Sequence, residues 1–103
     1  MPSYVTVNLD ITNRAMYDDY VAAVIPLLNK HHAEIVAADY AAKTLEGASR
    51  DVCVILRFAS EAAAMDWYMD PDYEPLKQMR FAATSNATLM LGQGFEASTA
   101  VPE

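Results

Sequence analysis

The order in which strand-like and helix-like spacings of apolar residues follow one another constrains the fold of this chain more than any other feature. Residues 4–11, YVTVNLDI, alternate apolar and polar side chains, which predicts a strand with one buried and one polar face. Residues 14–31 then place apolar side chains about every 3.6 positions, the spacing of an amphipathic helix. We expect Thr12 or Asn13 to cap this helix, and Pro26 to bend it without ending it.

The rest of the chain continues this succession of strand and helix patterns. The predicted elements are a long, bulged strand over 34–45, a hairpin turn at 47–51, a strand over 52–58, a helix over 61–69, a helical segment over 70–83 and a strand over 86–95. The order βαββαβ is the ferredoxin-like pattern, with a four-stranded antiparallel sheet and two helices on one face. We therefore predict a single α+β domain over 1–95 and a flexible tail over 96–103.

One face of such a sheet has no helix to cover it. A second copy of the chain is the simplest cover, so we predict a homodimer with a small cavity against the open sheet face. Four alanines of the second strand pattern are small enough to leave space there. They are Ala37, Ala38, Ala41 and Ala42.

Charge and composition exclude several classes of protein. The net charge is −7, and the seven Lys and Arg residues are scattered, whereas nucleic-acid binders gather basic residues on one face. No apolar stretch reaches the length of a membrane span, and the N-terminal residues lack the pattern of a signal peptide. The single cysteine, Cys53, lies in an apolar run and suits a reducing compartment. We expect a cytoplasmic protein without nucleic-acid or membrane partners.

Several short segments together resemble one known family. They are YDDYVAAVIPLL, TLEG, RFAS, WYMDPDYEPLKQMR and LMLGQG, in this order. Their order and spacing are similar to those of the bacterial domain-of-unknown-function family 1330, in the dimeric α/β-barrel superfamily, over roughly residues 4–94. The resemblance implies a dimeric ferredoxin-like fold and no established reaction. Relatives in that superfamily include cofactor-free monooxygenases of polyphenols, muconolactone isomerases and haem-binding proteins.

The neighbouring His31 and His32 are the only histidines of the chain. Adjacent residues point in different directions on a helix or a strand, so the pair is a poor chelate and we expect no metal site. His31 either ends the helix, favoured there by the helix dipole, or acts as a catalytic proton carrier. His32 stands where the family has glycine, and we expect it to take the left-handed capping conformation.

Arg57 is the first candidate for an anion site. It shares the polar face of the 52–58 strand with Cys53 and Ile55, and should lie near Tyr4 or Thr6 on the first strand. An enclosed arginine needs an anionic partner. That partner is either a ligand carboxylate or an acidic side chain such as Asp10, Asp39, Glu46 or one from the other subunit.

Other candidates also have a structural and a functional reading. Glu46 and Arg80 match the family pattern. They either contact each other, cap a helix end or contribute to a ligand site. Asn8 either orients a ligand carbonyl or bonds across the sheet. Helix-spaced aromatics are usually core, so of Trp67 and Tyr68 one should pack inside and the other face a cleft or the dimer partner.

The favoured hypothesis is binding, or cofactor-independent transformation, of a small anionic or phenolic metabolite. In this hypothesis Arg57 anchors the anion, Asn8 and Tyr4 orient it, and His31 carries the proton. The remaining ligand-site candidates are Glu46, Tyr68 and Arg80. The alternative is a non-catalytic dimeric interaction module whose cavity is filled. Haem binding through His31 would need an apolar pocket that its acidic neighbourhood does not suggest, so no cofactor is expected.

Overall fold

One antiparallel sheet carries all the helices on a single face. The computed structural model describes residues 1–95, and the four strands lie in the order β2-β3-β1-β4. The elements are β1 (Ser3–Ile11), α1 (Arg14–Lys30), β2 (Glu34–Asp39), β3 (Val52–Phe58), α2 (Glu61–Tyr68), the 3-10 helix η1 (Pro71–Tyr73), α3 (Glu74–Ala83) and β4 (Thr84–Gln93). The predicted ferredoxin-like fold is confirmed, whereas the predicted tail over 96–103 lies outside the described residues.

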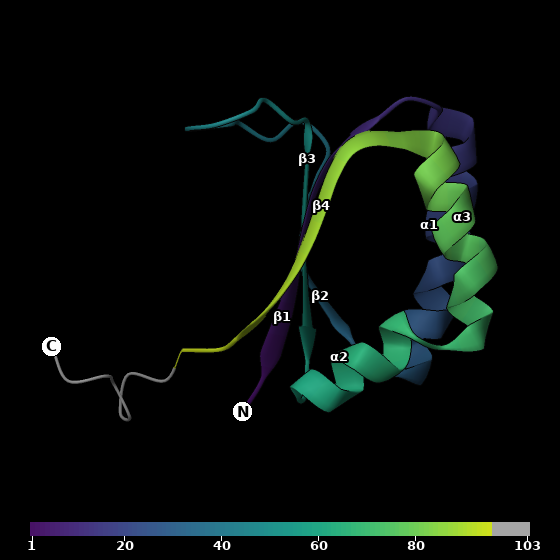
Figure 1. The fold of residues 1–103 in the computed structure, drawn as a ribbon, viewed down its shortest axis with the longest axis vertical. Helices are drawn as coiled ribbons and strands as arrows, with labels where there is room; N and C mark the ends of the chain where they lie inside the picture. Colours follow the sequence, from purple (N-terminus) through teal and green to yellow (C-terminus); the bar gives the residue numbers. More distant parts are fainter. Residues whose placement is uncertain (96–103) are drawn as a thin grey trace, which may run out of the picture.

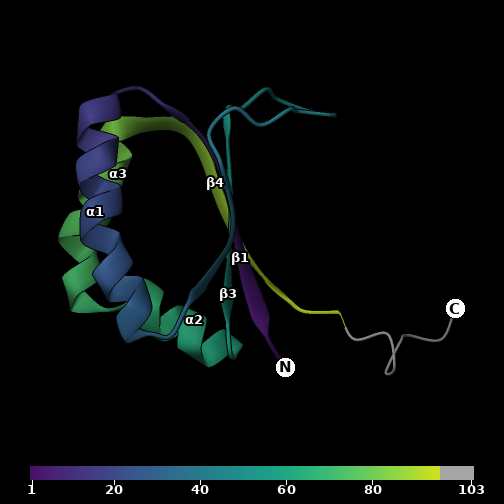
Figure 2. The same cartoon turned by 180° about the vertical axis from the view of Figure 1, so that it is seen from behind.

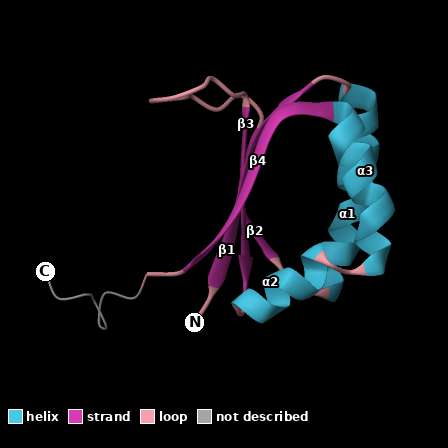
Figure 3. Cartoon of the chain, in the orientation of Figure 1, coloured by secondary structure: helices cyan, strands magenta, loops and turns pink. Residues whose placement is uncertain are grey.

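The helices form one layer and leave the second face of the sheet open. Figure 1 shows α1 and α3 side by side against the sheet, with α2 below them. Figure 2 shows the same arrangement from behind, and Figure 3 shows that neither helix nor strand covers the opposite face. The sheet is therefore covered on one side only within the described part of the chain.

The alternation of β1 and β3 explains which face is covered. Val5, Val7 and Leu9 of β1 are buried under the helices, and Leu56 and Phe58 of β3 lie beside them. Burying a side chain of this size stabilises the fold by about 1.5–3 kcal/mol. The alternate residues of both strands face the open side, as the pattern predicted.

A stack of aromatic rings holds the second half of the helix layer on the sheet. The Trp67 ring centroid lies 4.6 Å from that of Tyr73 and 5.5 Å from that of Phe58. Trp67 is 2% exposed, whereas Tyr68 is only half-buried. Of the two neighbouring aromatics, Trp67 is thus the core residue, which fixes α2 and η1 against β3.

Helix α1 begins and ends as its sequence indicates. The side chain of Asn13 accepts a hydrogen bond from the Met16 N–H, so Asn13 rather than Thr12 is the N-cap. The helix continues through Pro26 to Lys30 and ends in a Schellman motif. There the His32 N–H donates to the Asn29 carbonyl at 3.0 Å, and His32 has a φ of 57°. The predicted left-handed conformation of His32 is confirmed.

The second strand is shorter than predicted. It carries the expected bulge, between Ile35 and Ala37, but ends at Asp39 instead of residue 45. It ends there because the Asp39 carboxylate accepts a hydrogen bond from the Ala41 N–H at 2.8 Å, which turns the backbone. The predicted turn at 47–51 is therefore the far part of a longer connection over 40–51, drawn in teal in Figure 1.

The assignment of the N-cap gives a direct stability test. Asn13→Ala should lower the free energy of unfolding by about 1 kcal/mol, because it removes the acceptor for an orphan N–H of the first turn. Thr12→Ala is the matched control and should change it by less than about 0.5 kcal/mol. Urea denaturation of both variants measures the difference. A larger loss in Thr12→Ala would show that the cap is assigned to the wrong residue.

Candidate functional site

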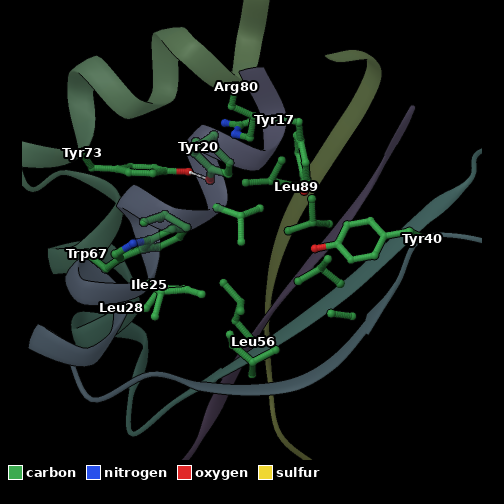
Figure 4. A pocket seen from close by; sticks show the side chains of 16 residues that line it. Tyr17, Tyr20, Ile25, Leu28, Tyr40, Leu56, Trp67, Tyr73, Arg80 and Leu89 are labelled. Carbon is green, nitrogen blue, oxygen red and sulfur yellow. Dashed lines mark hydrogen bonds between the residues drawn. The ribbon is translucent and has the colours of Figure 1, made fainter. Parts of the chain in front are cut away.

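An apolar cavity lies between the helix layer and the covered face of the sheet. Its volume is about 80 Å³, and most of its wall consists of valine, leucine and isoleucine side chains from α1 and from all four strands. Figure 4 shows polar groups entering this wall: Arg80 from α3, Tyr17 and Tyr20 from α1, and Tyr40 from the end of β2. The sequence predicts a cavity on the open sheet face, enclosed by a second copy of the chain, and this stays a prediction. The apolar cavity within residues 1–95 lies on the helix side, because the alternation of the strands points their large apolar residues there.

Arg80 is the most unusual residue of this cavity. It is 3% exposed, and its Nε is buried without a hydrogen-bond partner. Among residues 1–95, no ion pair joins its guanidinium to a carboxylate. The centroid of the Phe81 ring lies 4.9 Å from its guanidinium carbon, a cation–π contact. A buried charge without an anionic partner is costly. Arg80 thus places a positive charge without an acidic partner in the wall of the cavity, as far as residues 1–95 show.

Tyrosine hydroxyls surround the cavity but do not neutralise Arg80. The Tyr20 and Tyr73 hydroxyls share a hydrogen bond of 2.7 Å. Burial raises the pKa of Tyr17 to about 12, with a further contribution from Tyr40. Burial, followed by the proximity of Tyr73, also raises the pKa of Tyr20. Both phenols are therefore neutral near pH 7, where they can donate hydrogen bonds but carry no negative charge.

His31 lies outside this cavity. Its Nε2 is 2.8 Å from the Asp70 carboxylate, which also binds the Lys30 ammonium at 2.9 Å and caps η1 through the Asp72 N–H. The group ties the end of α1 to the start of η1, because Asp70 directly precedes Pro71. The role of His31 as a proton carrier stays a prediction.

Arg57 lies on the open face, opposite Tyr4 in the register of β1 and β3. This neighbourhood agrees with the sequence-based placement. The Arg57 side chain is 46% exposed, and its Nη1 lies 3.4 Å from the Glu34 carboxylate on β2. Glu34 was not among the expected partners, because the pairing of β2 with β3 depends on its bulge. An exposed pair of this kind contributes only about 0–1 kcal/mol.

Asn8 and Glu46 line a separate polar depression of about 250 Å³ on the open side, together with Arg50 and Cys53. Arg80 lies on the other side of the sheet. The expected contact between Glu46 and Arg80 is wrong, because the 40–51 connection extends away from the helix layer (Figure 1). The candidate residues are thus divided between the two sides of the sheet and do not form one site.

Tyr68 lines neither the interior cavity nor the polar depression on the open side. The Lys77 ammonium lies 3.9 Å from the centroid of its ring, a cation–π contact. Tyr68 also lines a second apolar cavity of about 260 Å³, which shares Trp67 and Leu89 with the first.

The sequence favours core positions for the helix-spaced aromatics, and its six tyrosines leave room for phenolic hydroxyls in a pocket. It does not indicate that Tyr17, Tyr20 and Tyr73 supply them. One signal was present. Tyr17 and Tyr20 share one face of α1, and Arg80 lies on α3, the helix that packs against α1. Tyr40 carried no such signal, because it was assigned to a strand.

Two further findings bear on ligands and membranes. Within residues 1–95 no cluster of three or more His, Cys, Asp or Glu side chains is arranged to hold a metal ion. Over the same range, no helix combines the length and the apolar character needed to cross a bilayer.

The family described as Domain of unknown function (DUF1330) matches residues 2–95. No curated protein is significantly similar to the chain. Solved structures are similar at low identity, which shows the fold alone. A protein of unknown function from Rhodopseudomonas palustris has a TM-score of 0.79 at 18% identity, covering 92% of this chain and 83% of the other.

Two other solved structures are similar to this chain with lower TM-scores. A dimeric ferredoxin-like protein of unknown function from Jannaschia sp. CCS1 has a TM-score of 0.70 at 12% identity, covering 91% of this chain and 100% of the other. SnoaB, a cofactor-independent oxygenase from Streptomyces nogalater, has a TM-score of 0.66 at 10% identity. That match covers 96% of this chain and 98% of SnoaB.

The Asp70 contacts predict how stability depends on pH. The hydrogen bond with His31, followed by those with the Asp72 N–H and the Lys30 ammonium, lowers the pKa of Asp70 in the folded state. A lowered folded-state pKa contributes stability that is present above the unfolded pKa of about 3.9 and is lost as the pH falls below it. Asp70→Asn should therefore destabilise the protein more at neutral pH than at about pH 2.5, as urea denaturation at both pH values would measure.

Asp66→Asn is the control for this experiment, because Asp66 is an exposed aspartate of α2. It should change the free energy of unfolding little at either pH. An Asp70→Asn variant equally destabilised at both pH values would contradict the assigned contacts.

Proposed function

Since the chain belongs to the DUF1330 family, which carries no assigned reaction, we propose a function from its own cavity: it binds a small aromatic molecule with one anionic or phenolic group. The ligand would lie between the sheet and helices α1 and α3, with its negative group at Arg80. The observation that carries this proposal is the buried guanidinium of Arg80, which has no acidic partner within the described residues.

The composition of the wall supports an aromatic ligand. Apolar side chains surround the centre of the cavity, and polar groups enter it only near Arg80 and the tyrosines. An apolar body with one polar end fits this distribution, because the body replaces water at the apolar wall and the charged end meets the guanidinium. The volume of about 80 Å³ lies below the range of about 300–1,000 Å³ that drug-sized ligands occupy, which favours a single ring.

The same arrangement supports a reaction without a cofactor. Burial raises the pKa of a phenol in this cavity, as it does for Tyr17 and Tyr20, whereas direct contact with the Arg80 guanidinium lowers it. We propose that this contact favours the phenolate of a ligand bound directly to Arg80. A phenolate is a more electron-rich nucleophile than the phenol. The neutral hydroxyls of Tyr17 and Tyr20 can hold such a substrate by hydrogen bonds. The likeness to SnoaB agrees with cofactor-independent oxygenation as the reaction class.

The alternative function is a non-catalytic dimeric module. Its support is the small volume of the interior cavity, which side-chain motion could close. The two functions differ in one respect. In a binding protein the Arg80 guanidinium would bind an anionic ligand. In a non-catalytic module whose cavity is filled by side chains it would bind none.

We also infer that two copies of the chain pair through the open sheet face. Ile55 lies at the centre of this face, and Met90 is largely exposed on its β4 side. Solved structures with this fold are described as dimeric. Apolar side chains at the middle of an uncovered sheet are most simply buried by a second copy.

Titration with benzoate tests the proposed ligand site. The chain has one tryptophan, Trp67, which lines the cavity, so its fluorescence reports binding there. Arg80→Met should weaken benzoate binding by about 2–5 kcal/mol, because it removes the buried positive charge. The stability of this variant should be unchanged or higher, since methionine fills similar space without a charge.

Arg57→Met is the matched control, because it removes an arginine from the open face. It should bind benzoate like the wild type. Loss of binding in Arg57→Met with retention in Arg80→Met would move the anion site to the open face. No binding by the wild type would favour the non-catalytic module.

The proposed dimer has its own test. Ile55→Lys should convert a dimer into a monomer of 11.3 kDa, because burying an unpaired ammonium costs several kcal/mol. Met69→Lys places the same charge at the exposed end of α2 and should remain dimeric. Light scattering after gel filtration gives the mass. A wild-type monomer, or a dimer unaffected by Ile55→Lys, would contradict this pairing.

A further inference from the structure

We propose that Tyr40 is the access and size-selecting residue of the interior cavity: its ring is the movable wall between that cavity and a polar depression at the surface. This inference rests on the proposed function for the class of ligand, an aromatic anion. The existence of the wall itself depends only on where Tyr40 lies.

Tyr40 lies on the border of two cavities. It lines the apolar interior cavity and also a depression of about 220 Å³ formed with Ile11, Arg14, Asp51 and Val52. Figure 4 shows its ring entering the interior cavity from the sheet side, with its hydroxyl toward the centre. A side chain that contacts both spaces separates them, so its rotation would join them.

The exposed residues of the cavity wall lie along the edge between α1 and β2. They are Ile25 of α1, Ile35 of β2 and Tyr40, which follows the end of β2 and is 38% exposed. Tyr20 and Arg80 are buried. The opening therefore lies between α1 and the edge strand β2, with Tyr40 beside it.

Few contacts hold the Tyr40 ring in place. It meets the Tyr17 ring edge-on at 6.1 Å between centroids, and the Arg14 guanidinium carbon lies 5.2 Å from its own centroid. In the described part of the chain its hydroxyl has no hydrogen bond. Asp39 fixes the turn of the backbone, and the Tyr40 side chain is partly exposed. A partly exposed side chain with such contacts changes rotamer rapidly.

The charges on the two sides of this wall differ. The outer depression holds Arg14, which pairs with Asp18, and the carboxylate of Asp51, whereas the interior cavity holds Arg80. An anion that enters past Tyr40 would leave Arg14, which already pairs with Asp18, for Arg80, which has no acidic partner in residues 1–95.

The ring of Tyr40 would also limit the size of the ligand. In its present position it occupies the sheet side of the opening and shortens the cavity. Its removal adds the space of a phenol ring next to the outer depression. A ligand with a second fused ring should then fit where a single ring fits in the wild type.

The first arm of the test measures access without relying on a ligand. Acrylamide is a small neutral quencher, and Trp67 is the single tryptophan and 2% exposed. Tyr40→Ala should raise the Stern–Volmer constant of Trp67 above the wild-type value, whereas Tyr40→Phe, which keeps the ring, should not. Leu45→Ala is the matched control, because it removes an exposed apolar side chain from the same connection without touching the cavity.

The second arm measures size selection with benzoate and 1-naphthoate. Tyr40→Ala should raise the affinity for 1-naphthoate relative to benzoate by about tenfold or more, comparable to the discrimination that an apolar pocket makes between ligands of different size. Tyr40→Phe and Leu45→Ala should keep the wild-type ratio. Unchanged quenching and an unchanged ratio in Tyr40→Ala would overturn the proposal.

The two arms separate this inference from the proposed function. If neither carboxylate binds but quenching rises in Tyr40→Ala, the wall is supported and the anion site is contradicted. If benzoate binds through Arg80 but Tyr40→Ala changes neither readout, the anion site is supported and the wall is overturned.

Discussion

The burial of one face of β1 and β3 under the helix layer is the constraint on which the rest of the structure depends. It places Val7 and Leu56 below α1 and α3, so the two layers meet through apolar side chains. Where the layers do not fill the space between them, an apolar cavity remains. The same constraint brings Arg80 of α3 inside, because the face of α3 that carries it packs toward the sheet. The candidate site is thus a consequence of the layer arrangement.

Arg80 and Arg57 show how burial separates two arginines of one small protein. Arg57 lies on the open face, exposed and paired with Glu34, and water solvates most of its charge. Arg80 lies in an apolar wall beside phenols that stay neutral near pH 7. Of these two arginines, only Arg80 is both buried from solvent and without an acidic partner among the described residues. A negative ligand would therefore gain more from Arg80 than from Arg57.

The sequence was sufficient for the fold but not for the site. The periodicity of β1 and β3 determined which residues face the helices, and Asn13 and His32 marked the ends of α1. The end of β2 was missed because a single hydrogen bond, from the Ala41 N–H to the Asp39 side chain, competes with continued strand pairing beyond Asp39. The position of Tyr17 and Tyr20 beside Arg80 was not predicted. Contacts between α1 and α3 depend on how the two helices pack, which no local pattern encodes.

A crystal structure of the protein with benzoate would test the central claim most directly. The account predicts density for one benzoate between the sheet and helices α1 and α3, with its carboxylate within hydrogen-bond distance of the Arg80 guanidinium. The Tyr40 ring would lie beside it. Benzoate bound at Arg57 on the open face, or an interior cavity closed by its own side chains at saturating benzoate, would contradict the account.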